Sequence, residues 1–289
     1  RGEHDITTDK RQCPAYTISG LLDAAARTAG GGVGEERMTM SELKPCPFKV
    51  ISLGWGVQSF TLAAMVALGE LEPIDAAIHA DTTHDSILTY SFAEKWTPWL
   101  EERGVMVITV KADDTDYIDR KYNYLQIPAY DSSGGIGKRQ CTTKWKIVPV
   151  RRKIRELSGG KPVEQWIGIS LDEIQRANKS GVQYVTNRFP LYEKRMTRAA
   201  CIHWLEFRGI EVPPKSACVF CPYHGLTDWR KTKAVGEDWQ EAVRVDEEIR
   251  HVRNNGVTNY LTNKRVPLLE LDLSTPEERG QINWIDEYS

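Results

Sequence analysis

The pattern of apolar positions predicts alternating strands and helices from residue 48 onward. Short apolar runs rich in β-branched residues, typical of buried strands, span 48–53, 74–80, 105–110 and 164–169. Apolar residues recur at helical spacing from Phe60 to Leu68, and again in the ranges 86–96, 198–208 and 226–254. This alternation favours an α/β fold with a doubly wound, mostly parallel sheet, followed by a C-terminal helical region that bears cysteines.

Changes in composition divide the chain into three parts. A glycine run at residues 30–34 has the composition of a linker, so residues 1–45 are interpreted as a flexible N-terminal appendage. Residues 46–195 are expected to form a nucleotide-binding domain. Residues 196–289 are expected to form the helical region with a Cys-x-x-Cys metal site.

The first strand is followed by a glycine-rich turn and then a helix. Glycines let the backbone approach a ligand, and the amides at the helix N-terminus attract anions. The turn lacks the lysine of a Walker loop and the spacing of a dinucleotide fold. An ordinary glycine turn is the alternative. The residues expected to bind phosphate are Ser52, Leu53, Gly54, Trp55, Gly56, Val57, Gln58 and Ser59.

An acidic, hydroxyl-rich segment follows the second predicted strand. Doubly wound sheets bind ligands at the carboxyl ends of their strands. Asp81 is therefore expected to bind a ribose hydroxyl or Mg²⁺, with Thr82 beside it. Capping of the next helix by Thr83 or Asp85 is the alternative, and both roles can hold together.

The range 138–155 contains eight lysines and arginines and no acidic residue. Uncompensated cations at this density attract phosphates, and Lys144 is the candidate catalytic cation among them. A solvated helix face is the alternative. The net charge of the chain is only −2, so any nucleic-acid binding must come from a local patch of this kind.

Four cysteines in the second half of the sequence suggest a metal centre. Cys218 and Cys221 form a Cys-x-x-Cys turn followed by proline, with Cys141 and Cys201 upstream. A [4Fe–4S] cluster, a structural Zn²⁺ and a redox pair all remain open from the residues alone. If Cys201 belongs to the core, three thiolates remain. Clustered cysteines favour a reducing cytoplasm, and no apolar run approaches a membrane span.

The loop at 52–59 resembles the PP-loop of the N-type ATP pyrophosphatases, and most closely their PAPS reductase-like branch. The resemblance covers about residues 48–230 and implies an adenine nucleotide alpha hydrolase-like fold that uses ATP and Mg²⁺. It also implies that Gly168 and Arg176, in the segment after the strand at 164–169, lie near the nucleotide phosphates. This family context favours the [4Fe–4S] cluster over zinc.

Reductases of this family attack with a cysteine near the C-terminus, but no cysteine follows Cys221 here. We therefore expect an ATP-dependent sulfurtransferase that adenylates and then thiolates a group of a nucleic acid, tRNA or DNA, using a separate sulfur donor. In this hypothesis Ser52, Ser59, Asp81, Lys144 and Arg176 are the catalytic residues. A sulfonucleotide (APS or PAPS) reductase-like enzyme and a zinc-stabilised nucleic-acid-binding module are the alternatives, and a homodimer is left open.

Overall fold

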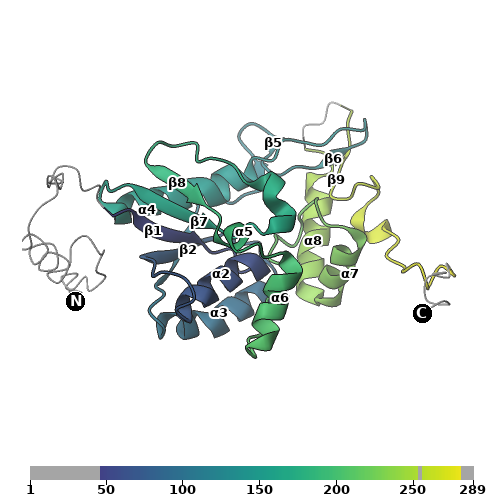
Figure 1. Ribbon diagram of the computed structural model, residues 1–289. Helices are drawn as coiled ribbons and strands as arrows, with labels where there is room; N and C mark the ends of the chain where they lie inside the picture. The colour runs from purple at the N-terminus through teal and green to yellow at the C-terminus, as the bar shows by residue number, and fades with distance from the viewer. Residues whose placement is uncertain (1–45, 253–255, 281–289) are drawn as a thin grey trace, which may run out of the picture.

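A computed structural model describes residues 46–252 and 256–280 (Figure 1). Its centre is a five-stranded sheet in the order β3-β2-β1-β7-β8, in which every neighbouring pair is parallel. The strands are β1 (Phe48–Ser52), β2 (Ala76–Asp81), β3 (Val107–Lys111), β7 (Val163–Ile167) and β8 (Val185–Arg188). The strand order reverses at β1, as in doubly wound sheets. The predicted α/β class is thereby confirmed.

Helices cover both faces of this sheet, as Figure 1 shows. One face packs against α2 (Val57–Ala67), α3 (Ile87–Glu101), the short α5 (Pro190–Glu193) and α6 (Arg198–Phe207). The other face packs against α4 (Val148–Ser158) through Val150 and Ile154. Thr197 caps α6 by accepting from the Ala200 amide at 3.1 Å, as its sequence position predicts.

The entry to α3 differs from the prediction. Ser86 is the N-cap, and its Oγ accepts a hydrogen bond from the Leu88 amide at 3.2 Å. Thr83 adopts a left-handed backbone with φ 63°, while Asp85 forms a bridge to a distant segment. Neither predicted capping residue therefore caps the helix.

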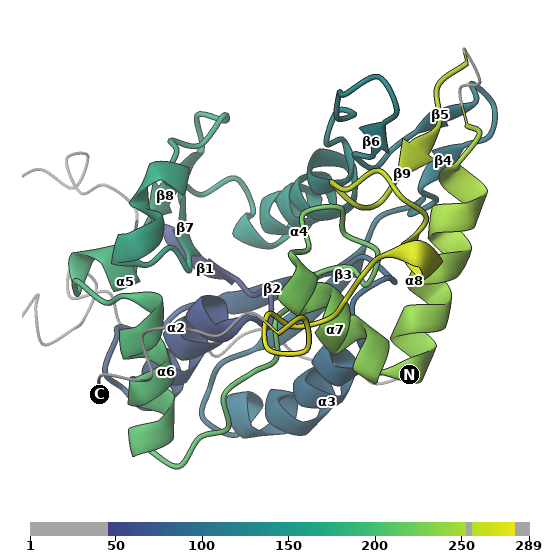
Figure 2. The same cartoon turned by 90° about the vertical axis from the view of Figure 1, so that its right-hand side faces the viewer.

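A second hydrophobic core lies beside the sheet and combines two distant parts of the chain. The insertion after β3 contributes β4 (Ile118–Asp119), β5 (Tyr124–Leu125) and β6 (Tyr130–Asp131). The C-terminal part contributes α7 (Leu226–Ala234), α8 (Gly236–Ile249), β9 (Asn259–Tyr260) and the turn η4 (Leu268–Glu270). β6 pairs antiparallel with β9, which joins the two parts, as Figure 2 shows.

Two short helical segments complete the described chain. The π-helix η2 (Thr142–Ile147) leads directly into α4, and the 3₁₀-helix η3 (Leu171–Arg176) follows β7. The predicted appendage at 1–45 lies outside the described residues. In the described part of the chain, every helix is too short or too polar to cross a membrane.

Candidate functional site

A cavity of about 250 Å³ opens where β1, β2 and β7 end. Ser52, Leu53 and Gly54 line it from β1 and the turn, His79 and Ala80 from β2, and Ile167 from β7. This is the point at which the strand order of the sheet reverses, the usual ligand position of such sheets. We call it the nucleotide cavity.

The turn after β1 is held in shape by Ser59. The Ser59 hydroxyl accepts from the Gly54 amide at 3.1 Å and donates to the Gly56 carbonyl at 3.2 Å. No side chain caps the N-terminus of α2, which leaves its first amides available for an anion. The side chains of Trp55 and Val57 are buried in the core, so these two residues offer only backbone to a ligand.

Gly168 fits tightly against this turn. A Cβ atom at position 168 would lie 2.7 Å from the Ser59 nitrogen and 2.8 Å from its Cα. Glycine is therefore the residue that lets the segment after β7 pack against the start of α2. The predicted proximity of Gly168 to the phosphate loop has a steric basis.

His79 forms part of the cavity wall. Its Nδ1 lies 3.0 Å from the Leu53 carbonyl oxygen, which can only accept, so Nδ1 carries the proton. Burial lowers the pKa of His79 below its ordinary value of 6.5. The ring is thus neutral near pH 7 and keeps a lone pair on Nε2.

Two cations line the nucleotide cavity, and neither is the predicted one. Lys146 and Arg151 contribute to its wall, and neither side chain has an ion-pair partner among residues 46–252 and 256–280. The ammonium of Lys144 instead donates to Tyr124 Oη at 2.9 Å and to Gln126 Oε1 at 3.0 Å. Lys144 thus does not line the nucleotide cavity, and its catalytic role stays a prediction. The basic run contains all of these cations, but the sequence did not indicate which of them line the cavity.

Arg176 lies outside the nucleotide cavity. Its side chain is 65% exposed and forms an ion pair of 2.7 Å with Glu173. Glu173 in turn accepts from Gln58 Nε2 at 3.1 Å. Arg176 is therefore linked to the loop through Glu173 and Gln58, and its contact with the phosphates stays a prediction.

Asp81 has a structural role in this fold. One carboxylate oxygen accepts from the Thr83 amide at 2.7 Å and from Tyr90 Oη at 2.8 Å, and the other lies 3.3 Å from Lys111 Nζ. Although burial opposes it, these donors hold the pKa of Asp81 below its ordinary 3.8. The carboxylate lines neither the nucleotide cavity nor the cysteine cavity described next, and binding of ribose or Mg²⁺ by Asp81 stays a prediction.

A second cavity of about 110 Å³ is lined by Cys141, Cys218 and Cys221. We call it the cysteine cavity. The Cys218 backbone bridges to Asp85, and the Val219 amide donates to the His84 carbonyl at 2.8 Å, so the Cys-x-x-Cys turn is fixed to the end of β2. The Cys141 amide donates to the Gln126 carbonyl at 3.0 Å.

Polar neighbours surround the Cys218 thiol. Thr82 Oγ1 lies 3.4 Å from Cys218 Sγ, so the hydroxyl of this predicted nucleotide contact is next to a thiol of the cysteine cavity. Burial and the nearby Asp85 raise the pKa of Cys218 to about 12. Asp85 is 5% exposed, and both of its carboxylate oxygens lack a hydrogen-bond partner among the described residues. A buried carboxylate with no donor is costly, and helix capping was the one role predicted for Asp85 from the sequence.

Cys201 lies apart from the other three cysteines. It belongs to α6 and is fully buried in the core, beside Thr61 of α2. Burial raises the pKa of this thiol to about 11. The predicted fourth metal ligand is therefore a core residue, and the alternative of three thiolates fits the structure.

The three thiols of the cysteine cavity are the donors available for the metal centre expected from the sequence. No three histidine, cysteine or carboxylate side chains within 46–252 and 256–280 come close enough together to hold one metal ion. Thiolates are the ligands that iron–sulfur clusters use, so the chemistry of this donor set fits such a cluster.

The nucleotide and cysteine cavities adjoin each other. Lys146 lines both of them. A Cβ atom on Gly56 would lie 3.7 Å from Cβ of Ser216, a residue that lines the cysteine cavity. The start of α2 therefore lies against the segment that leads into the Cys-x-x-Cys turn, although 160 positions (56 to 216) separate the two residues in sequence.

No protein-family model matches this chain, and no curated protein matches it in sequence. Solved structures that are similar to it include the two described here. A phosphoadenylyl-sulfate (PAPS) reductase from Candida auris, in a phosphate complex, is 14% identical over 63% of this chain and 92% of that chain, with a TM-score of 0.42. The U34-tRNA thiolase NcsA from Methanococcus maripaludis, with its [4Fe-4S] cluster, is 17% identical over 75% and 70%, with a TM-score of 0.37. Both belong to the superfamily that the sequence resembles, and the likeness concerns the fold alone.

Proposed function

We propose that this chain is an ATP-dependent sulfurtransferase that thiolates a carbonyl group of a nucleic acid. The observation that carries the proposal is the shared wall between the two cavities: Lys146 lines both, and Gly56 lies beside Ser216. A nucleotide held in the first cavity would place its phosphates beside the thiols of the second. Neither cavity alone would favour sulfur transfer over ordinary nucleotide hydrolysis.

The nucleotide half of the reaction is assigned to the loop and the two cations. The free amides at the start of α2 would bind the departing pyrophosphate, while Lys146 and Arg151 would stabilise charge that develops on the α-phosphate. The acceptor carbonyl oxygen attacks the α-phosphorus of ATP. The bond between the α-phosphorus and the oxygen that bridges to the β-phosphate breaks, and pyrophosphate leaves. The oxygen is then part of an adenylate and can depart as AMP.

The sulfur half needs no change of oxidation state if the donor is at the level of sulfide. Sulfide attacks the activated carbon, the carbon–oxygen bond breaks, AMP leaves, and a proton is lost from sulfur to give the thiocarbonyl. Cys141, Cys218 and Cys221 would hold the cluster, with the Thr82 hydroxyl beside Cys218. When bound, a cluster on three thiolates would supply an iron site that is not occupied by protein.

The central experiment tests the thiol set. Purified anaerobically, the wild type is expected to be brown and to contain iron and acid-labile sulfide. Serine variants of Cys141, Cys218 and Cys221 should each lose most of the iron, because each removes one of only three ligands. Cys201→Ser is the matched control and should retain it. Iron loss that is equal in all four variants, or colourless protein that contains zinc and no sulfide, would contradict the assignment.

The reaction itself distinguishes the remaining alternative. Cluster-loaded protein with ATP, sulfide and RNA or DNA should produce AMP, pyrophosphate and a thiolated product in equal amounts. Release of sulfite from APS or PAPS would instead identify a sulfonucleotide reductase. Protein that carries the cluster but binds no adenine nucleotide would end the sulfurtransferase proposal.

A further inference from the structure

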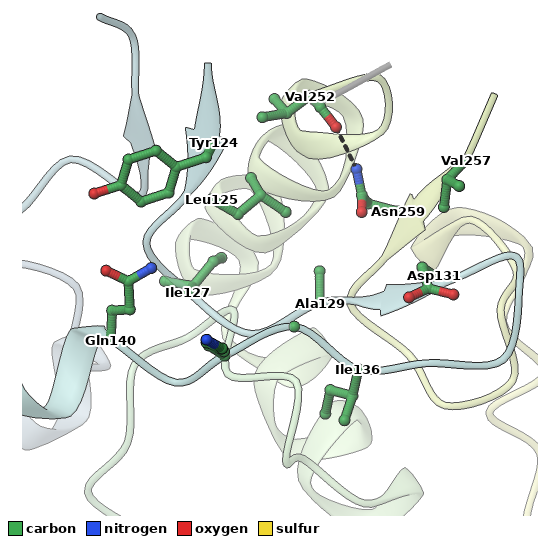
Figure 3. Close-up of a pocket in the computed structure, with 12 residues that line it drawn as sticks. Tyr124, Leu125, Ile127, Ala129, Asp131, Ile136, Gln140, Val252, Val257 and Asn259 are labelled. Atoms are coloured by element: carbon green, nitrogen blue, oxygen red, sulfur yellow. Dashed lines mark hydrogen bonds between the residues drawn. The ribbon is translucent and has the colours of Figure 1, made fainter. Parts of the chain in front are cut away.

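A further cavity lies where the insertion after β3 meets the C-terminal tail. Its volume is about 590 Å³, within the range of small-molecule sites. Figure 3 shows Leu125, Ile127 and Ala129 between Tyr124 and Gln140 on one side and Asn259 on the other. We call it the insertion cavity. It contributes nothing to the nucleotide site described above.

The insertion cavity and the cysteine cavity share a wall. Ile127 lines both. Along the segment 138–141 the lining alternates: Lys138 and Gln140 belong to the insertion cavity, whereas Arg139 and Cys141 belong to the cysteine cavity. A ligand in one cavity is thus separated from a ligand in the other by the width of one short backbone segment.

The chemistry of the lining suits a flat heterocycle. Apolar side chains form the floor, and Tyr124 offers a ring beside them. Asn259 donates its amide hydrogens to the carbonyls of Ile249 and Val252 at 3.0 and 2.9 Å, which leaves its amide oxygen as an acceptor. The Gln140 side chain has no hydrogen-bond partner among the described residues. Two amides beside an apolar floor can read the polar edge of a base.

The charges around the cavity favour an anionic ligand. Lys138 has no ion-pair partner in the described ranges. Arg139 lies over the Tyr223 ring at 5.2 Å, and Lys144 lies over the Tyr124 ring at 5.4 Å. Asp131, the acidic residue of the lining, is engaged within its own loop, where Oδ1 accepts from the Ser133 and Gly135 amides at 2.9 Å. Tyrosines paired with cations are a common platform for single-stranded nucleic acid.

We infer that the insertion cavity binds one unstacked base of a single-stranded nucleic acid, next to the nucleotide whose acceptor group faces the cysteine cavity. The identity of that neighbouring group rests on the proposed function, but the cavity and its ligand class do not. A base held here would fix the strand in register, so that the adjacent nucleotide is presented to the thiols. A duplex would have to open before it could bind in this way.

Two variants and two controls test this inference. Tyr124→Ala removes the ring, and Ile136→Glu places a negative charge on a lining residue that is 44% exposed and therefore tolerant of the change. Tyr122→Ala is the tyrosine control, because Tyr122 is 66% exposed on the same insertion and does not line the cavity. Met106→Glu is the charge control, since Met106 is 47% exposed immediately before β3, at the opposite end of the sheet strands.

The measurement is fluorescence anisotropy with short labelled RNA and DNA single strands, their duplexes, and competing AMP. Tyr124→Ala and Ile136→Glu should each weaken single-strand binding about tenfold, in keeping with the loss of one stacked base, and the controls should bind like the wild type. Affinity for an ATP analogue should be unchanged in all four.

Three results would overturn the inference: wild-type binding by both cavity variants, equal affinity for duplex and single strand, or displacement of the strand by AMP as effective as by unlabelled strand. Strand binding that depends on Tyr124 in a protein without ATP turnover would support the cavity assignment while ending the sulfurtransferase proposal. ATP turnover together with wild-type strand binding by both cavity variants would support the sulfurtransferase proposal and end the cavity assignment.

Discussion

Lys144 and Lys146 lie two positions apart in the same π-helix but face different surroundings. Lys144 is held by Tyr124 and Gln126 of the insertion, whereas Lys146 lines the wall shared by two cavities. An ammonium without a fixed partner beside a phosphate site is available to stabilise charge in a transition state. Its position, more than its charge, distinguishes Lys146 within the basic run.

Lys146→Ala should lower the rate of AMP and pyrophosphate formation by about a hundredfold, the usual loss for one preorganised charge-stabilising group. Lys153→Ala is the control, because that lysine pairs with Glu156 at 2.7 Å on the adjacent helix and faces neither cavity. Steady-state kinetics with matched iron content would measure the effect. A large loss in Lys144→Ala together with none in Lys146→Ala would show that the sequence-based choice was the correct one.

Asp81→Asn should alter stability rather than nucleotide affinity, since the Asp81 carboxylate is engaged by Thr83, Tyr90 and Lys111. The folded carboxyl has a pKa below its ordinary 3.8, so its stabilising contribution is present above that pH and is lost as the pH falls through the folded pKa. The variant should be less stable than the wild type by about 1 kcal/mol at neutral pH. The difference in unfolding free energy between the wild type and Asp81→Asn should disappear at acid pH, where the carboxyl of the wild type is protonated.

Urea unfolding from neutral pH to below the aspartate range would measure this, with exposed Glu94→Gln as the control. A variant that keeps its stability but loses affinity for Mg-ATP would restore the original assignment of Asp81 as a ligand.

At the scale of elements, the phosphate loop depends on how closely two segments pack. The start of α2 packs against the segment after β7 at Gly168 and lies against the segment that leads into the Cys-x-x-Cys turn at Ser216. The positions of the loop amides are therefore set by contacts from two other parts of the chain. A substitution at either contact should therefore change the affinity of the loop for nucleotide phosphates.

Gly168→Ala should destabilise the protein by about 1–3 kcal/mol and weaken nucleotide binding, because the new Cβ would overlap the Ser59 backbone. Gly236→Ala is the matched control, since nothing lies within 4 Å of its added Cβ. Denaturant unfolding and isothermal titration with an ATP analogue would measure both effects. Unchanged binding in Gly168→Ala would show that the loop does not need this contact.

At the scale of the whole molecule, the second core fixes two of the three cavity cysteines. Cys141 and Cys218 pack against the core that joins the insertion to the C-terminal helices. Within it Asp246 is 1% exposed, accepts from the Leu261 amide at 3.0 Å and the Leu268 amide at 2.9 Å, and pairs with Arg250. One buried carboxylate thus ties the tail to α8.

Asp246→Asn should cost about 3 kcal/mol, because the amide cannot accept from all of these donors and leaves a buried cation without its partner. Hydrogen exchange should show lost protection at Leu261 and Leu268 before any change in β1. Exposed Glu247→Gln, the next residue on α8, should behave like the wild type. Uniform loss of protection across both cores would show that the second core is not a separate unit of stability.

The sequence by itself determined the alternation of strands and helices, the glycine turn with serines at both ends, and the cysteine turn. These depend on local periodicity and on residue-specific backbone preferences, which act within a few positions. For that reason β1, β2, β3, β7 and α6 lie where the apolar pattern predicts them.

The tertiary structure alone decided which members of each set face the site. Lys146 replaced Lys144, Cys201 entered the core, and Asp81 was engaged by its neighbours while Asp85 remained without a partner. The direction of a side chain depends on what packs against its element, and those neighbours come from other segments, 18–20 positions away for Lys144 and 140 positions away for Cys201 beside Thr61. The local sequence identifies the side chains that could line the two cavities, and tertiary packing determines which of them do.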